Sequence, residues 1–183
     1  MKGVERKKKL SPGQREALRG QNIEKMEMHN TIPPFLTITE IINRYFAALD
    51  QKEFDLETMG RIFSEDAKVL RPNGTAMLGL RAIGESHAQS MSRFRVTQHL
   101  PSGFIIDSID NTTARFRGNL VAIHFWAEAM GNPDADPNDN FFLAGGVTTG
   151  QVALFPNGWR ITELANQIIW RRGIGFEQMQ KTK

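Results

Sequence analysis

Residues 37–50, TITEIINRYFAALD, set the organisation of the rest of the chain. The stretch opens on a capping-box pattern, Thr37-x-x-Glu40, and its apolar residues then recur at helical spacing, which predicts an amphipathic helix. Asp50 ends this helix at the edge of the apolar stripe, where the helix dipole disfavours a negative charge. Asp50 therefore either has a compensating partner in the fold or is a solvated turn carboxylate.

Two shorter helices and a set of long strands are predicted after this helix. Apolar residues at helical steps predict helices over 56–63 and 79–94, and a short strand, 66–71, lies between them. Beyond Arg95 the apolar residues alternate with polar ones. This period of two predicts strands over residues 96–107, 112–128, 141–155 and 159–171.

The order of these elements indicates the fold class. Helices followed by a meander of long strands predict an α+β fold, in which a curved antiparallel sheet wraps around the N-terminal helices as a cone-shaped barrel open at one end. Such a sheet needs bulges, and these are expected at Pro101-Ser-Gly103 and at Gly145-Gly146. Pro156-Asn-Gly158 is typical of a hairpin turn between the last two strands.

The basic charge of the chain comes from its N-terminal segment. Residues 1–30 contain eight Lys or Arg against four acids, a balance of +4, while the whole chain carries +3, so the remainder carries −1. The high pI is therefore no argument that the folded domain binds nucleic acid or an anionic membrane. The segment is a solvated tail or a binding arm, with a polar helix predicted from Ser11 to about His29.

The 183 residues suit one folded domain with two appendages. We expect an N-terminal extension over 1–36, the α+β domain over 37–176 and a C-terminal tail over 177–183. The absence of cysteine excludes disulfides and thiolate chemistry. No stretch approaches the roughly 20 apolar residues that span a bilayer, and no apolar segment follows the N-terminal lysines. We therefore expect a soluble, cytoplasmic protein with no membrane partner.

Two histidines stand where the pattern expects apolar residues. His99 follows Thr97-Gln98, and His124 shares a strand face with Leu120 and Trp126. An imidazole backed by a carboxylate such as Asp50 is a common device for moving protons near neutral pH. The alternative for His124 is a core histidine bonded to a backbone carbonyl.

Tyr45 is the only tyrosine of the chain. It precedes Asp50 by five residues, which corresponds to a rotation of roughly 140° about the helix axis. The two residues therefore face different parts of the pocket entrance at the end of this helix. The Tyr45 hydroxyl is a candidate hydrogen-bond partner for a substrate carbonyl, and its alternative role is that of a plain core residue.

These motifs, taken in order, resemble the SnoaL-like branch of the nuclear-transport-factor-2-like superfamily over about residues 37–176. The resemblance rests on five segments: Tyr45-Phe-Ala-Ala-Leu-Asp50, Phe63-Ser-Glu-Asp-Ala67, Gly79-Leu-Arg-Ala-Ile-Gly84, Thr97-Gln-His99 and Gly158-Trp-Arg-Ile161. Within the superfamily the pattern is similar to that of scytalone dehydratase and the bile acid 7α-dehydratases. Those enzymes pair an aspartate at the end of the first core helix with a histidine on a later strand.

The resemblance implies a set of site residues. The catalytic set is His99, Asp50, Tyr45 and His124, and the substrate-binding set is Trp126, Thr149, Gln151 and Leu120. Scytalone dehydratase uses a second tyrosine, and this chain has Arg71 near the place where it would be expected. No cofactor is implied. No metal is expected, because two strand histidines without a third ligand fall short of the usual coordination.

The function implied is that of a cofactor-independent lyase of the dehydratase type, or an isomerase or cyclase, acting on a cyclic apolar hydroxy-ketone or polyketide. Steroid double-bond migration and dehydrochlorination are related activities on this fold. The alternative is a non-catalytic module that binds a small molecule or a protein. A dioxygenase small subunit is disfavoured, because those subunits do not need an Asp–His pair.

The second face of strand 112–128 bears on assembly. It mixes charged and apolar residues, which favours a contact between subunits. These residues are Arg115, Val121, Ile123 and Phe125. We expect a homo-oligomer, with a trimer favoured over a dimer.

Overall fold

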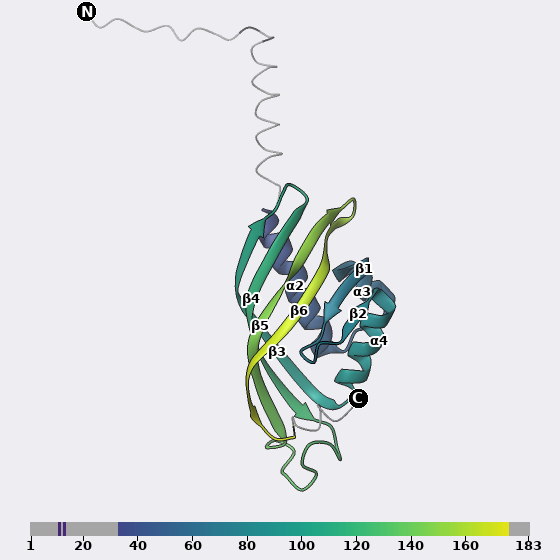
Figure 1. Cartoon of the computed structure of the whole chain (residues 1–183), viewed down its shortest axis with the longest axis vertical. Coiled ribbons are helices and arrows are strands. Elements are labelled where there is room, and N and C mark those ends of the chain that lie inside the picture. Colours follow the sequence, from purple (N-terminus) through teal and green to yellow (C-terminus); the bar gives the residue numbers. More distant parts are fainter. Residues whose placement is uncertain (1–10, 12, 14–32, 176–183) are drawn as a thin grey trace, which may run out of the picture. The chain divides into compact units, whose positions relative to one another are not determined.

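The computed structural model describes residues 11, 13 and 33–175 (Figure 1). The predicted helix up to His29 and the predicted tail 177–183 lie outside these residues. Contacts divide the chain into two units, 1–34 and 35–183. The elements discussed below belong to the second unit, apart from the first residue of the first helix.

The α+β prediction is confirmed by the succession of helices and strands. Their ends differ from the predicted ones by a few residues, and one short strand, β2, lies where no strand was predicted. The elements are α2 (Pro34–Gln51), α3 (Leu56–Ile62), β1 (Phe63–Leu70), β2 (Ala76–Leu78), α4 (Leu80–Met91), β3 (Phe94–Ser108), β4 (Thr113–Trp126), β5 (Phe141–Phe155) and β6 (Gly158–Gly173).

One sheet contains all six strands, in the order β2-β1-β6-β5-β4-β3. Figure 1 shows α2 lying against the long curved strands, with α3, α4, β1 and β2 gathered beside it. The sheet is mixed rather than wholly antiparallel, since β1 pairs in parallel with β6. This pairing was not predicted, because it joins the first strand to the last. A local pattern of alternation predicts where strands lie but not which strands pair.

Bulges bend the long strands at both predicted places. The register of β3 against β4 shifts between Ser102 and Ile105, just after Pro101, and that of β5 against β6 shifts between Gly145 and Gly146. A bulge adds an unpaired residue to one strand and increases its bend and twist. These bulges let the sheet curve around α2.

The second bulge changes which residues of β6 face inward. Gly145 pairs with Trp170 and the next pair involves Ile168, so Ile169 is the extra residue. Side chains alternate between the two faces of a strand, and an extra residue inverts the alternation beyond it. Arg171 therefore faces inward like Ile168, and Trp170 faces outward over Gly145.

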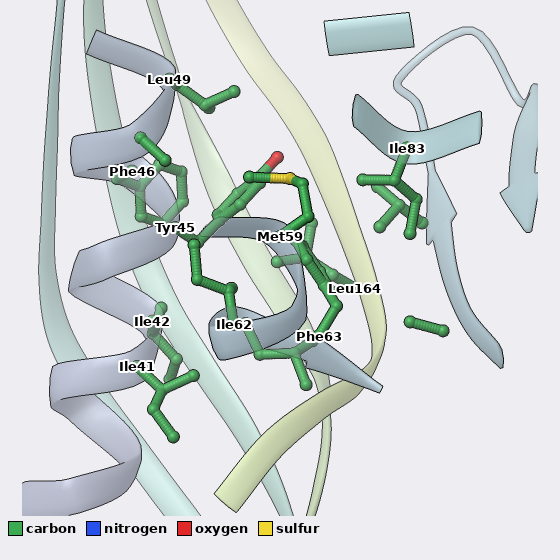
Figure 2. Packing of buried hydrophobic residues seen from close by; sticks show 14 of the residues in the cluster. Ile41, Ile42, Tyr45, Phe46, Leu49, Met59, Ile62, Phe63, Ile83 and Leu164 are labelled. Carbon is green, nitrogen blue, oxygen red and sulfur yellow. The ribbon is translucent and has the colours of Figure 1, made fainter. Parts of the chain in front are cut away.

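Helix α2 is held in place by its buried face. Figure 2 shows its side chains directed towards those of α3 and the start of β1. A fully buried apolar side chain of this size contributes about 1.5–3 kcal/mol relative to an exposed one. The buried residues of this contact include Ile38, Ile42, Tyr45, Phe46, Leu49, Met59, Ile62 and Phe63. Packing along the helix therefore fixes its C-terminal end, where Asp50 lies.

The outer face of the sheet carries exposed apolar groups. One row across it pairs Leu100 with Val121, Val121 with Gly145, and Gly145 with Trp170. This is the face for which the sequence predicts a subunit contact, and the oligomeric state stays a prediction. None of the helices within residues 33–175 is both long and apolar enough to cross a lipid bilayer.

Replacing Gly146 with alanine is expected to lower the free energy of unfolding by about 1–3 kcal/mol, the usual cost of overpacking. A Cβ atom there would lie 2.0 Å from the carbonyl oxygen of Gln167, so the bulge would have to shift. Urea unfolding followed by tryptophan fluorescence measures the change. The control is Gly60→Ala in α3, where the Cβ would have an ordinary 3.6 Å contact and alanine favours the helix. Equal stability of wild type and Gly146→Ala would contradict the close packing.

Candidate active site

Asp50 and His99 meet at the junction of α2 and β3. The Nδ1 atom of His99 lies 2.6 Å from Oδ1 of Asp50. The backbone N–H of His99 donates to Oδ2 over 2.8 Å, and the Thr97 hydroxyl donates to Oδ1 over 2.8 Å. The carboxylate thus accepts three hydrogen bonds from one short segment of β3. The catalytic role of the pair stays a prediction.

These contacts keep Asp50 ionised. Burial alone would raise its pKa, but the hydrogen bonds from the ring and backbone of His99, the charge of that ring and the Thr97 hydroxyl outweigh burial and lower the pKa. An ionised carboxylate is an acceptor only, so Nδ1 of His99 must carry a proton. In the neutral ring, Nε2 is then the basic nitrogen.

His99 lines a cavity of about 600 Å³. One row of paired residues crosses the inner face of the sheet from His99 to Ala122, from Ala122 to Ala144 and from Ala144 to Arg171. The two alanines in the middle of this row leave space that larger side chains would fill. The floor of the cavity is therefore apolar at its centre, with the imidazole of His99 at one end and the guanidinium of Arg171 at the other.

His124 lines the same cavity beside His99, and their ring centroids are 5.2 Å apart. Its ring stacks on Phe142 at 4.5 Å and packs against Phe94 at 4.8 Å. Burial first, and then the positive charge of His99, lowers the pKa of His124 to about 3, although Asp50 opposes this. Within the described residues its buried Nδ1 has no hydrogen-bond partner. His124 is thus a neutral imidazole with hydrogen-bonding capacity left over.

Tyr45 and His87 form a second pair in the cavity wall. The Tyr45 hydroxyl lies 3.5 Å from Nε2 of His87, which is a long and therefore weak hydrogen bond. Burial raises the pKa of Tyr45, so the phenol stays protonated. Burial, followed by the charges of Arg71 and His99, lowers the pKa of His87 to about 4. The side chain of Asn166 also bonds to the Tyr45 hydroxyl, so this hydroxyl has two neutral partners in the cavity wall.

His87 was not predicted as a site residue, and the structure places it on the buried face of α4. It is 7% exposed and lines the cavity. The signal was present in the sequence, since His87 occupies an apolar position of the α4 stripe, between Ile83 and Met91.

The predicted substrate-binding residues separate into two groups. Leu120 lines the cavity, whereas Trp126, Thr149 and Gln151 are not among the lining residues. Thr149 and Gln151 flank Gly150 on the outward positions of β5, because Thr148 is the buried neighbour. Trp126 is buried in the core, where its Nε1 donates to the carbonyl oxygen of Ile174 over 2.7 Å. Their positions give no support to the substrate-binding role predicted for these three.

Several cavity residues were not predicted as a set. Arg71, Arg93, Arg171 and Asn166 all line it. Arg71 and Arg93 lie at the ends of the predicted strand 66–71 and helix 79–94, and in the structure they fall just outside these elements, in connecting segments. In the described part of the chain, no group of three His, Cys, Asp or Glu residues is arranged to hold a metal ion.

Fold and site together define a small α+β cone whose cavity holds a carboxylate-oriented imidazole beside two neutral imidazoles and a phenol. Residues 35–165 match the model of the SnoaL-like domain, and the chain belongs to this family. No curated protein matches the sequence at a significant level.

Solved structures with the same fold include proteins named as a dehydratase and as a dehydrochlorinase. A candidate scytalone dehydratase from Novosphingobium aromaticivorans is 19% identical, with a TM-score of 0.63 over 84% of this chain and 91% of that one. A hexachlorocyclohexane dehydrochlorinase from Novosphingobium barchaimii is 10% identical, with a TM-score of 0.62 over 83% and 93%. The Kfla4162 protein of Kribbella flavida is 20% identical, with a TM-score of 0.67 over 75% and 91%. At these identities the likeness establishes the fold.

Replacing Asp50 with asparagine is expected to change the tautomer of His99. Asparagine has one acceptor oxygen where Asp50 accepts three hydrogen bonds, so its NH₂ group must face either the His99 ring or the His99 backbone N–H. Long-range ¹H–¹⁵N correlation NMR of the neutral ring distinguishes the two tautomers. We expect only the Nδ1–H tautomer in the wild type and a substantial population of the Nε2–H tautomer in the variant. Asp107→Asn, an exposed change on the same strand, is the control. An unchanged tautomer in Asp50→Asn would show that the carboxylate does not set it.

The buried neutral histidines should make stability fall below neutral pH. The pKa of His124 is about 3 in the folded protein and that of an unfolded histidine is about 6.5, so the stabilisation is present above pH 6.5 and is lost as pH falls towards 3. The His124→Phe variant lacks this titrating group. Between about pH 7.5 and pH 5 its free energy of unfolding should therefore fall by on the order of 2 kcal/mol less than that of the wild type. Urea unfolding at the two pH values measures this difference. Parallel losses would mean that His124 is not neutral in the folded state.

Proposed function

We propose that the protein is a cofactor-independent lyase of the dehydratase type, acting on a cyclic hydroxy-ketone or polyketide. The observation that carries the proposal is the geometry of His99. Its Nδ1 is bound to Asp50 at 2.6 Å and its ring lines the cavity, so the remaining nitrogen is available to a substrate. A neutral imidazole oriented by a carboxylate is a competent general base.

The proposed reaction is an elimination through an enolate. Nε2 of His99 takes a proton from the carbon alpha to the substrate carbonyl, and the electron pair of that C–H bond moves onto the carbonyl oxygen. The carbonyl then re-forms as the C–O bond to the hydroxyl on the beta carbon breaks. His99 returns its proton to that hydroxyl, which leaves as water.

Tyr45 is the proposed donor to the enolate oxygen. Its raised pKa keeps the hydroxyl protonated, and its neighbours in the cavity are the neutral side chains of His87 and Asn166. Removal of one such oriented donor typically costs about 3 kcal/mol of transition-state stabilisation. The neutral His124 is the second group able to bond to the substrate.

The comparisons support the elimination chemistry without fixing the substrate. A dehydratase removes water and a dehydrochlorinase removes hydrogen chloride, and proteins with both names share this fold. Isomerisation and cyclisation begin with the same removal of an alpha proton. The same base would therefore serve these reactions on other substrates.

Replacement of His99 with glutamine is expected to lower kcat about 10²- to 10⁴-fold, the usual contribution of a general base. The probe is 3-hydroxy-1-tetralone, because loss of water gives 1-naphthol, whose fluorescence reports turnover directly. Asp50→Asn should also lower kcat, through the orientation of His99. The control is Asp107→Asn, an exposed carboxylate that lies outside the site.

The outcomes of this assay are distinct. Formation of naphthol by the wild type and its loss in His99→Gln support the proposal. Turnover that survives His99→Gln would exclude His99 as the base. Saturable binding of the tetralone without turnover, across a panel of ring sizes and leaving groups, would favour the alternative of a non-catalytic binding module.

A further inference from the structure

Three guanidinium groups line the cavity. They belong to Arg71 after β1, Arg93 before β3 and Arg171 in β6, and the lining residues include no Asp or Glu. Asp50, the carboxylate bonded to the lining residue His99, is engaged with His99 and Thr97. A purely apolar ligand would therefore leave the positive charge of the cavity uncompensated.

None of these arginines is paired with a carboxylate in the part of the chain that the structure describes. The ion pairs found there are Arg44–Glu40, Arg61–Glu57 and His99–Asp50. Arg71 and Arg93 instead bond to neutral groups of α4. Nη2 of Arg71 donates to the Ser90 hydroxyl over 2.7 Å and to the Ser86 carbonyl, and Nε of Arg93 donates to the Ser90 carbonyl over 3.3 Å.

Both guanidinium groups are thus anchored on the same turn of α4, close to each other. Burial lowers the pKa of Arg71, and the charge of Arg93 lowers it further. Burial also lowers the pKa of Arg93. Two partly buried like charges without a counter-charge are unfavourable, and an anion bound between them offsets this cost.

The hydrogen bonds also leave donors free. A guanidinium has five N–H donors, and those of Arg71 to α4 use Nη2 alone. A planar guanidinium edge matches the two oxygens of a carboxylate or a phosphate. Anchoring by α4 holds these edges in place before a ligand arrives, which lowers the cost of ordering them.

We infer that the substrate carries an anionic group, a carboxylate or a phosphate, which Arg71 and Arg93 bind while its ring body lies over Ala122 and Ala144. This rests on the proposed function, since it names the substrate class of that same cavity. It narrows the proposed substrate class: the substrate is a cyclic hydroxy-ketone that also carries a carboxylate or a phosphate ester, with its reacting carbons near His99.

A pair of fluorescent probes with one aromatic body tests the charge preference. 8-Anilinonaphthalene-1-sulfonate is anionic, and N-phenyl-1-naphthylamine lacks the sulfonate. We expect the wild type to bind the sulfonate at least about tenfold more tightly, the difference that one charge-assisted hydrogen bond makes. Arg71→Gln and Arg93→Gln should each remove most of this preference while changing the Kd of the neutral probe less than about twofold.

Arg172→Gln is the matched control, because Arg172 is exposed and is not a lining residue. Arg71→Lys keeps the charge and N–H donors for the α4 contacts but loses the planar edge. Thermal unfolding of each variant separates misfolding from loss of the anion site. Equal affinity of the wild type for both probes, or an equal weakening of both in the folded arginine variants, would overturn the inference.

Displacement of the sulfonate probe identifies the anion. Naphthalene-1-carboxylate, 1-naphthyl phosphate and 1-naphthol share a ring system and differ in the charged group. Stronger displacement by either anion than by naphthol supports the anion site and identifies the anionic group that it binds. Equally strong displacement by naphthol contradicts the anion site. His99→Gln should leave the charge preference intact, so failure of the lyase proposal and failure of the anion site are separate results.

Discussion

The carboxylate of Asp50 joins the two parts of the fold that make the cavity. It ends a helix whose apolar face is buried, and it accepts three hydrogen bonds from Thr97 and His99 on strand β3. Strand β3 is the edge of the sheet, with a neighbour on one side only. These bonds therefore give that edge a partner from the helix layer. The same contact that anchors the edge strand also orients the imidazole, so structure and chemistry depend on one residue.

Around the Asp50–His99 pair the cavity keeps its other histidines neutral. Burial lowers the pKa of His87 to about 4 and that of His124 to about 3. An apolar enclosure favours the neutral form of an imidazole. His99 has the carboxylate as its partner, whereas His124 packs against Phe94 and Phe142. Three histidines in one cavity thus have different partners and different capacities for proton transfer.

Local pattern was sufficient to predict the helices, most strand positions and the two bulges. It also singled out Asp50, His99 and His124, because each breaks an apolar stripe. It did not predict that β1 pairs with β6, nor that the arginines converge, because both depend on segments far apart in the chain. Thr149 and Gln151 were assigned to the cavity from family resemblance alone, and the alternation along β5, set by the buried Thr148, directs them outward.

The bulge at Ile169 has an evolutionary consequence. Because it inverts the alternation of β6, it decides which of two adjacent residues, Trp170 or Arg171, faces the cavity. If the same sequence paired with β5 without the bulge, Trp170 would lie opposite the inward Ala144 and Arg171 would face outward. The bulge therefore determines the charge of the cavity without any substitution of a lining residue. Comparisons that align such strands without gaps will assign inward and outward residues incorrectly.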